Sequence, residues 1–335
     1  MTMSGSGAGR SRGGKTIRHK ATGMALLLDI RDPLWMKEED LRDFLTPLLP
    51  GTRIRTKSSD RVDPDVIMLA TVKLHPGLVA TLPNLKLVQK LGAGVDGIVR
   101  DPDLPTHVRV TRLRPDTPAQ EIAEYCVAYV LRDQRNLLFH AAKAANHSWK
   151  QIAPRRSPDT TVGVLGLGHI GARTARYFSS LGFRVLGWSR SEKRIEGVEC
   201  RHGDEALREI LPFCDYVASV LPSTARTGDL FDADRFAIMK PGAVLINVGR
   251  GTVVDEPALA RALMDGELAG AVLDVFQQEP LSQDSSLWNA PGLMVTGHVA
   301  AHSRPADIAV IFRENYRRYC AGETLEYLID FERGY

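Results

Sequence analysis

The feature that most constrains this chain is a run of alternating glycines at residues 161–171, with the sequence Thr-Val-Gly-Val-Leu-Gly-Leu-Gly-His-Ile-Gly. Its apolar start predicts a short buried strand, and an amphipathic run that begins at His169 predicts a helix. Between them Gly166, Gly168 and Gly171 have the spacing G-x-G-x-x-G. In this spacing one glycine makes a tight turn, one lets the backbone approach a pyrophosphate, and one lets the helix pack on the strand. The pattern favours a dinucleotide site over a glycine-rich structural turn.

Alternating strand and helix patterns on both sides of this stretch predict an α/β protein with two parallel sheets. From residue 161 onwards six strands are expected, the number in a complete, doubly wound Rossmann sheet. Four earlier strands predict a smaller, flavodoxin-like α/β unit, in which Asp32-Pro33 is expected to open a helix that runs through Leu48. The expected strands are 24–30, 66–72, 85–91 and 108–113 in the smaller unit, and 161–165, 183–188, 216–221, 243–248, 270–275 and 293–296 in the larger one.

Two further helical patterns are expected to connect the units. One begins at about Ala119 and would carry the chain from the smaller unit to the larger, and one over about residues 304–319 would bring it back. The smaller, substrate-binding domain would therefore be built from both ends of the chain. The expected division is residues 21–118 and 304–335 for the substrate-binding domain and residues 119–303 for the dinucleotide-binding domain.

Composition excludes several classes of protein. Residues 1–20 are rich in glycine, serine and arginine and hold no acid, so they are expected to be a disordered basic segment. Their positive charges outnumber the net charge of +3 of the whole chain, so residues 21–335 are together close to neutral. Nucleic acid is therefore not an expected partner. No apolar run approaches the roughly 20 residues of a membrane helix, and the cysteines lack C-x-x-C spacing. We therefore expect a cytoplasmic protein without a membrane partner or a metal site.

The end of the second strand of the larger unit bears on the choice between NAD(H) and NADP(H). In NAD-binding versions an acidic residue at this point binds the ribose 2′-hydroxyl. Here Ser189 and Arg190 take that position, and Lys193 follows closely. A guanidinium group pairs with a 2′-phosphate that a carboxylate would repel. The sequence thus predicts NADP(H) as the preferred cofactor, with NAD(H) possible, and the alternative is that Arg190 is a solvated loop residue.

Three residues suited to chemistry follow three successive strands of the larger unit. Arg250 lies between two glycines, Glu279 follows the next strand, and His298 follows the last one. Each has an ordinary alternative, respectively as a helix-capping residue, a loop charge and a core histidine. Because the carboxyl ends of parallel strands lie at one edge of a sheet, where such sheets bind ligands, the three together favour a catalytic set.

This set fits hydride transfer to a 2-keto acid. Arg250 can hold a carboxylate bidentately and polarise the carbonyl group, and His298 can supply the proton. Glu279, if bonded to the imidazole, would favour its protonated form and orient the ring. Gly92 and Gly94 also follow a strand, so their loop either exposes N–H groups to a ligand or forms a plain turn.

With these motifs in view, the chain resembles the D-isomer-specific 2-hydroxyacid dehydrogenases. Within them it is most similar to the NADPH-dependent glyoxylate/hydroxypyruvate reductases of the bacterial A type. The segments that carry the resemblance, besides the glycine loop and the three polar residues, are 91–96, 188–190, 273–276, 298–301 with Arg304-Pro305, and 333–335.

The resemblance implies roles for individual residues and a homodimer built through the nucleotide domains. Arg250, Glu279 and His298 would be the catalytic residues, and Ala93, Gly94 and Arg250 would bind the substrate carboxylate. Asp274 would face the nicotinamide amide. The implied cofactor-binding residues are Thr117, Gly166, Gly168, His169, Ile170, Ser189, Arg190, Lys193, Leu221, Pro222, Val248, Gly249, Asp274 and Ala300.

The expected activity is NADPH-dependent reduction of glyoxylate to glycolate and of hydroxypyruvate to D-glycerate. Two departures leave the exact 2-keto acid open: Gly297 stands where the family usually has proline, and residues 117–124 differ from the subgroup pattern. One alternative is another member of the family, of the phenylpyruvate, D-lactate or phosphoglycerate type. The alternative from another class is a nucleotide-sensing protein like the corepressors that share this fold, which would bind the cofactor without useful turnover.

Overall fold

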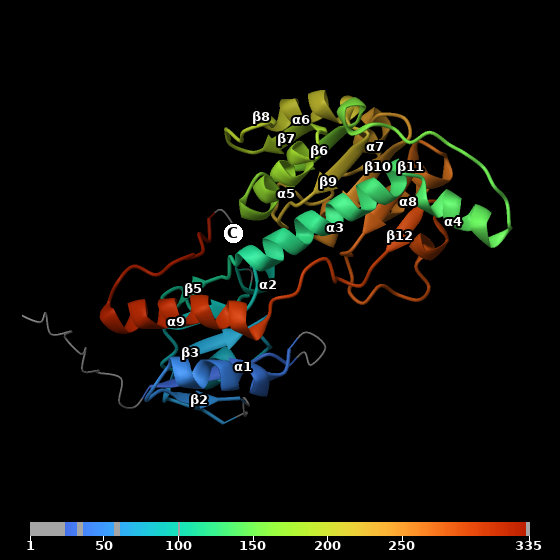
Figure 1. Cartoon of the computed structure of the whole chain (residues 1–335). Coiled ribbons are helices and arrows are strands. Elements are labelled where there is room, and N and C mark those ends of the chain that lie inside the picture. The colour runs from blue at the N-terminus through green and yellow to red at the C-terminus, as the bar shows by residue number, and fades with distance from the viewer. Residues whose placement is uncertain (1–23, 32–35, 57–60, 100, 333–335) are drawn as a thin grey trace, which may run out of the picture.

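The computed structural model describes residues 24–31, 36–56, 61–99 and 101–332. The basic segment 1–20, the Asp32-Pro33 pair and the C-terminal residues 333–335 lie outside these described residues. Figure 1 shows two α/β units, with the long helix α3 (Asp116–Gln134) running between them. The fold is therefore the α/β architecture with two parallel sheets that the sequence predicts.

The smaller unit is a five-stranded parallel sheet with the strand order β2-β1-β3-β4-β5. Helices α1 (Glu38–Leu45) and α9 (Pro305–Ala321) pack on one face of it. The short helix α2 (Asp96–Val99) packs on the other face. The strands are β1 (Ala25–Asp29), β2 (Arg53–Arg55), β3 (Val66–Thr71), β4 (Leu87–Lys90) and β5 (Arg109–Thr111).

Two features of this unit differ from the sequence prediction. The edge strand β2 was not predicted, because it has only three residues, none of them fully buried, and its one apolar residue, Ile54, lies between two arginines and so makes no apolar pattern. Helix α1 begins at Glu38 and not at Asp32-Pro33. The acids that favour a helix start are Glu38 and the two residues after it, and the Glu38 carboxylate also accepts a hydrogen bond from the Ile30 amide at 2.8 Å.

The larger unit is a seven-stranded parallel sheet with the order β12-β11-β10-β9-β6-β7-β8. The expected number of six strands is wrong, because β8 (Glu199–His202) adds to the edge beside β7; its side chains are largely polar and none is buried. The other strands are β6 (Thr161–Leu165), β7 (Arg184–Ser189), β9 (Tyr216–Ser219), β10 (Ala243–Asn247), β11 (Leu268–Leu273) and β12 (Leu293–Val295).

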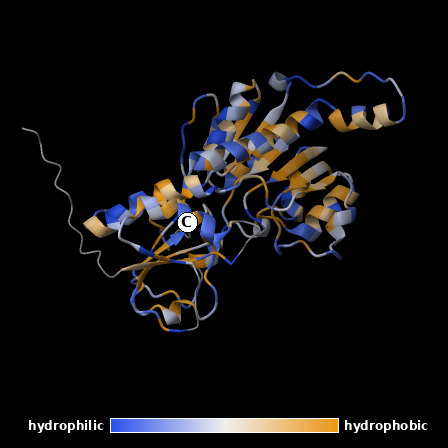
Figure 2. Ribbon diagram, turned by 60° about the horizontal axis from the view of Figure 1, so that its bottom comes forward, coloured by the Kyte–Doolittle hydropathy of each residue, from blue (hydrophilic) through white to orange (hydrophobic). Residues whose placement is uncertain are grey.

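Helices cover both faces of the larger sheet. Helices α3 and α5 (His169–Ser180) pack on one face, where Cys126, Val130 and Phe178 are buried against strand residues. The helices on the opposite face are α6 (Asp204–Ile210), α7 (Ala233–Ile238) and α8 (Glu256–Met264). Helix α4 (Leu137–Ala145) has no buried residue and projects from the unit, as Figures 1 and 2 show.

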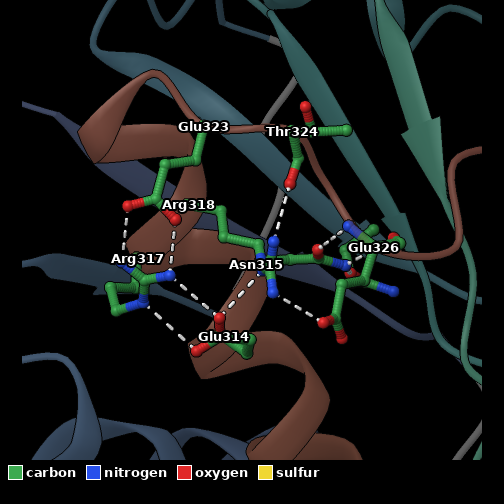
Figure 3. A network of polar contacts seen from close by, with 8 residues as sticks. Glu314, Asn315, Arg317, Arg318, Glu323, Thr324 and Glu326 are labelled. Carbon is green, nitrogen blue, oxygen red and sulfur yellow. Dashed lines mark hydrogen bonds and ion pairs between the residues drawn. The ribbon is translucent and has the colours of Figure 1, made fainter.

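The segment after α9 is fastened to the smaller sheet by polar contacts. Arg318 bonds Glu314 within α9 and Glu326 beyond it, and Arg317 bridges Glu314 and Glu323 (Figure 3). The segment then pairs with the end of β5, where the Ile329 amide donates to the Val110 carbonyl at 2.9 Å. The C-terminal part of the described chain thus belongs structurally to the first sheet, which brings the first and last described residues into one unit.

Inside this network a buried amide fixes strand β4. Asn315 of α9 donates a hydrogen bond to the Gln89 side chain at 3.2 Å, and Thr111 of β5 donates to the same oxygen at 2.8 Å. Gln89 and Asn315 are both 1% exposed. Because buried polar groups of this kind are costly to leave unbonded, the end of β4 is held in one position.

Within the described residues, no helix is long and apolar enough to cross a membrane.

Candidate functional site

The two sheets meet where Arg250, after β10, reaches the loop of residues 92–96, after β4. Its Nε donates to the Asp96 carboxylate at 2.9 Å, and its Nη1 donates to the Gly249 carbonyl at 2.8 Å. A Cβ atom added at Gly94 would overlap the guanidinium group, so a side chain here would displace Arg250 from its present position. Arg250 therefore lies directly against the backbone of the loop that was expected to bind the substrate carboxylate.

Asp96 is a residue of this site whose role the sequence did not reveal. Burial opposes its ionisation, but the Arg250 guanidinium beside it outweighs that effect and holds the pKa of Asp96 below its usual value. The Asp96 carboxyl group is therefore ionised at neutral pH. Only its place at the start of a helix after a glycine loop could have drawn attention to Asp96, because its partner is about 150 residues away in the sequence.

Glu279 and His298 form the second half of the site. His298 Nδ1 lies 2.7 Å from Glu279 Oε2, and the other Glu279 oxygen accepts a hydrogen bond from the Phe276 amide at 3.0 Å. The hydrogen bond to Glu279 raises the pKa of His298 above its usual value, although burial opposes it. Burial would raise the pKa of Glu279, but the hydrogen bond with His298 lowers it. The geometry thus favours an imidazolium–carboxylate pair.

The loop that carries His298 is held by Asp274, which follows β11. The Asp274 carboxylate is 1% exposed and accepts hydrogen bonds from the Val299 amide at 2.8 Å and the Ala300 amide at 2.9 Å. Its backbone carbonyl accepts a third from the His298 amide at 2.8 Å. His298 has a φ of 57°, in the left-handed region that non-glycine residues seldom adopt. Asp274 therefore stabilises the unusual turn that presents the imidazole, while its expected contact with the nicotinamide stays a prediction.

The three expected catalytic residues are close enough to influence one another electrostatically. The charge of Arg250 acts to lower the pKa of both Glu279 and His298. His298 keeps 53% of its side chain exposed, and Glu279 keeps 37%. A cation, a carboxylate and an accessible imidazole thus face a common space at the carboxyl ends of the strands.

The glycine loop has the geometry that its spacing predicts. Gly166 has a φ of 98° and makes the turn after β6. A Cβ atom at Gly171 would overlap the carbonyl oxygen of Gly166, so this glycine allows α5 to pack closely. A Cβ atom at Gly168, the N-cap of α5, would meet nothing within 4 Å. Gly168 therefore leaves open space beside free helical N–H groups, which suits a phosphate group.

Further expected cofactor-binding residues surround this opening. Leu221 packs against Gly166, and a Cβ atom at Gly249 would overlap the Leu221 carbonyl oxygen, so the ends of β6, β9 and β10 lie close together. His169 Nε2 lies 3.3 Å from the Pro115 carbonyl oxygen at the start of α3. Thr117, on the first turn of α3, donates to Asp307 of α9 at 3.2 Å. Of the remaining expected residues at these strand and helix ends, Ile170 and Pro222 are at least partly exposed, whereas Val248 and Ala300 are buried.

The expected 2′-phosphate site lies at the end of β7. Ser189 is buried, and its hydroxyl donates to the Ser191 carbonyl at 2.8 Å, which bends the chain after the strand. Arg190 follows on the exposed side of this turn. Lys193 lines a surface hollow with Ile195 and His202. These cations are therefore accessible to an anionic group, as the NADP(H) prediction requires.

Lys90 is a second charged residue of the site that the sequence did not reveal. It ends β4 and is only 8% exposed. Burial, together with the Arg250 charge, lowers the pKa of Lys90 to about 7, and the Asp96 carboxylate opposes the shift. A lysine at the end of a strand expected to be buried was the available signal. In the described part of the chain, no group of three or more His, Cys, Asp or Glu side chains is arranged to hold a metal ion.

Comparisons with known proteins show which family this chain is similar to. The sequence profile of "D-isomer specific 2-hydroxyacid dehydrogenase, NAD binding domain" matches residues 127–300. Glyoxylate/hydroxypyruvate reductase A of Klebsiella pneumoniae is 34% identical over 310 residues, which is 90% of this chain and 96% of that protein. Its counterpart in Serratia proteamaculans is 35% identical over 77% of this chain and 84% of that protein.

Solved structures give the same result. A D-isomer specific 2-hydroxyacid dehydrogenase from Xanthobacter autotrophicus, in complex with NADPH and MES, is 40% identical with a TM-score of 0.87, over 94% of this chain and 100% of that one. An NADPH-dependent glyoxylate/hydroxypyruvate reductase from Sinorhizobium meliloti, in complex with NADP and sulfate, is 32% identical with a TM-score of 0.86, over 93% and 100% of the two chains.

Proposed function

Because the chain belongs to the D-isomer-specific 2-hydroxyacid dehydrogenase family, we propose that it reduces small 2-keto acids with NADPH, converting glyoxylate to glycolate and hydroxypyruvate to D-glycerate. The observation that carries the proposal is the 2.7 Å contact between His298 and Glu279 beside Arg250. A binding module needs no proton donor of raised pKa, whereas carbonyl reduction does.

The residues of the chain have distinct roles in substrate binding and proton transfer. Arg250 and the amides of Ala93 and Gly94 bind the substrate carboxylate, which places the carbonyl oxygen near His298. Bound NADPH supplies the hydride to the carbonyl carbon. His298 donates its proton to the oxygen, and Glu279 stabilises the protonated imidazole beforehand and keeps the ring oriented.

The fit of a nicotinamide dinucleotide rests on the glycine loop, and the preference for NADPH on residues after β7. The open space at Gly168 would accommodate the pyrophosphate at the start of α5. Arg190 and Lys193 would pair with the 2′-phosphate, and Ser189 shapes the turn that presents them. The two similar structures are complexes with NADPH and with NADP, which supports the same preference.

The domain division and the assembly are also proposals. The packing of α9 on the first sheet supports a substrate-binding domain of residues 21–118 and 304–335, with residues 119–303 as the dinucleotide-binding domain.

A homodimer formed through the dinucleotide-binding domains is supported by α4 and the segment after it, where Leu138 is 59% exposed and Trp149 is 92% exposed. Exposed apolar patches of this kind mark interaction surfaces. Sedimentation of the wild type and of a Leu138→Asp, Trp149→Asp variant tests this: a dimer that dissociates in the variant is expected, and a monomeric wild type contradicts it.

Initial rates with NADPH and NADH against glyoxylate, hydroxypyruvate, pyruvate and phenylpyruvate test the activity. We expect the two small polar acids to be reduced fastest with NADPH, and a His298→Asn variant to lose turnover while it retains NADPH binding. Turnover of the bulky acid alone would favour another member of the family. Tight cofactor binding without turnover of any acid would contradict the proposal and favour a nucleotide-sensing role.

A further inference from the structure

A buried lysine lies beneath the loop that receives Arg250. Lys90 is the last residue of β4, and its neighbour Gln89 is fixed on the opposite face by Thr111 and Asn315. Its Nζ atom approaches Gly92 so closely that a Cβ atom there would be 2.9 Å away. The glycine therefore leaves room for the ammonium group, which points from the strand end toward the residues 92–96.

Two charges of the site act on this ammonium group. Asp96, which begins α2, favours the protonated form of Lys90, and Arg250 opposes it. Asp96 is itself the partner of Arg250, at 2.9 Å. Lys90 and Arg250 are thus two cations from different sheets near one loop, and Asp96 is ion-paired with Arg250 and within electrostatic reach of Lys90.

Other charged residues near the loop of residues 92–96 come from different elements of the fold. Lys73, after β3, packs with its Cβ 3.7 Å from the position of a Cβ at Gly97. Arg112, after β5, donates to the Ala93 carbonyl at 3.3 Å and so holds the loop from the other side. On the far side of Arg250 lie Glu279 and His298, whose pKa values respond to its charge.

We propose that Lys90 is a positioning residue for substrate binding: its buried ammonium group, beside Gly92, adds positive charge under the loop that receives Arg250 and so strengthens the attraction of the Arg250 site for the substrate carboxylate. This deepens the proposed function and rests on it, because it takes Arg250 with Ala93 and Gly94 as the carboxylate site. When Lys90 loses its proton, this positive charge is lost and the site attracts an anion less strongly.

The consequence is an affinity for 2-keto acids that falls as the pH rises. Burial brings the pKa of Lys90 to about 7, so its charge changes within the physiological range. Below that pH the ammonium group is present and the KM for glyoxylate is low. Above it the KM rises while kcat is governed by His298, which donates the proton. Linkage requires the reverse effect as well, so that a bound carboxylate favours protonation of Lys90.

The test compares KM and kcat for glyoxylate in the wild type and in Lys90→Met from about pH 6 to pH 9. Since His298 titrates in both proteins, the ratio of their KM values isolates Lys90. We expect the variant KM to be about tenfold higher at the acidic end and nearly equal at the alkaline end, with kcat within about twofold. Lys90→Arg, which keeps its charge throughout, should retain a low KM at about pH 9. The matched control is Lys86→Met, at the exposed residue directly before the same strand, which should behave as the wild type.

A ratio of the variant KM to the wild-type KM that stays near one at every pH would overturn the proposal. A ratio that is raised but does not change with pH would also overturn it, because it would indicate a merely structural role for Lys90. Oxamate binding to the NADPH complex, followed by nicotinamide fluorescence, gives the same comparison without turnover. A wild type that reduces no 2-keto acid, but whose oxamate affinity shows the pH-dependent difference, would refute the proposed function and support the role of Lys90. An active wild type with no such difference would refute the role of Lys90 alone.

Discussion

Two glycines in the loop after β6 should respond differently to substitution by alanine. One substitution should mainly lower the stability of the fold, and the other should mainly weaken cofactor binding. A Cβ atom at Gly171 would overlap the carbonyl oxygen of Gly166 and lie 3.0 Å from its carbonyl carbon, so α5 must move away from the sheet. Overpacking of this kind costs about 1–3 kcal/mol, and the gain in helix propensity returns at most about 1 kcal/mol. We expect Gly171→Ala to lose about 1–2 kcal/mol of stability and to bind NADPH more weakly, because the displaced helix carries the N–H groups that face the phosphates.

Gly168→Ala is the matched variant. Its Cβ atom would meet no protein atom within 4 Å and its φ of −75° suits alanine, so only the weaker preference of alanine for the N-cap should lower stability, by less than about 1 kcal/mol. The methyl group would instead occupy the space proposed for the pyrophosphate, and we expect the KM for NADPH to rise at least about tenfold.

Urea denaturation and NADPH fluorescence titration of both variants measure the two effects separately. The reasoning would be refuted if Gly171→Ala were as stable as the wild type, or if Gly168→Ala bound NADPH with unchanged affinity. A loss of stability in Gly168→Ala equal to that in Gly171→Ala would also contradict it, because the structure gives that methyl group nothing to displace.

Three other changes have defined outcomes. In Glu279→Gln the pKa of His298 should fall, because the hydrogen bond that raises it is weakened; reduction needs the protonated imidazole, so the alkaline loss of kcat should move to lower pH in a rate profile. Arg190→Asp should lower the ratio of kcat/KM with NADPH to that with NADH by about tenfold or more, measured by paired initial rates. Lys90→Met should be more stable than the wild type at about pH 7, since a charged lysine is no longer buried. That difference should shrink by about 2 kcal/mol by pH 9 in urea denaturation, as the wild-type pKa of Lys90 is about 7 against 10.5 for a free lysine.

Local patterns were sufficient to predict most strands and the long helices. Strand β6 and helix α9 lie within two residues of their expected positions, because buried strands and amphipathic helices repeat their apolar residues at fixed intervals. The two missed strands, β2 and β8, are edge strands with polar or exposed side chains. One sheet neighbour holds each of them in place, and its backbone hydrogen bonds leave no apolar signature in the sequence.

The location of the candidate site could also be predicted in part from the pattern of strands. Arg250, Glu279 and His298 follow strand ends, so their common location can be predicted from the order of strands alone. The role of Asp274 in holding the His298 loop could not, because its hydrogen bonds to the Val299 and Ala300 amides depend on a turn with positive φ. A sequence shows that an aspartate is present but not which backbone groups turn toward it.

The groups proposed to react and the groups that adjust them lie on different sheets. The proton donor and its carboxylate belong to the larger unit, whereas Lys90 and Asp96 belong to the smaller one, where Asp96 bonds Arg250 and Lys90 lies beneath the loop of residues 92–96. A substitution in the smaller unit can therefore change affinity for the substrate without altering proton transfer. If substrate preference is set in this way, exchanging Lys90 should change KM for several 2-keto acids by a similar factor, because it acts on the carboxylate that they share. Differences among the acids must then come from side chains that face the rest of the substrate, and residues 117–124 at the start of α3 are where we expect them.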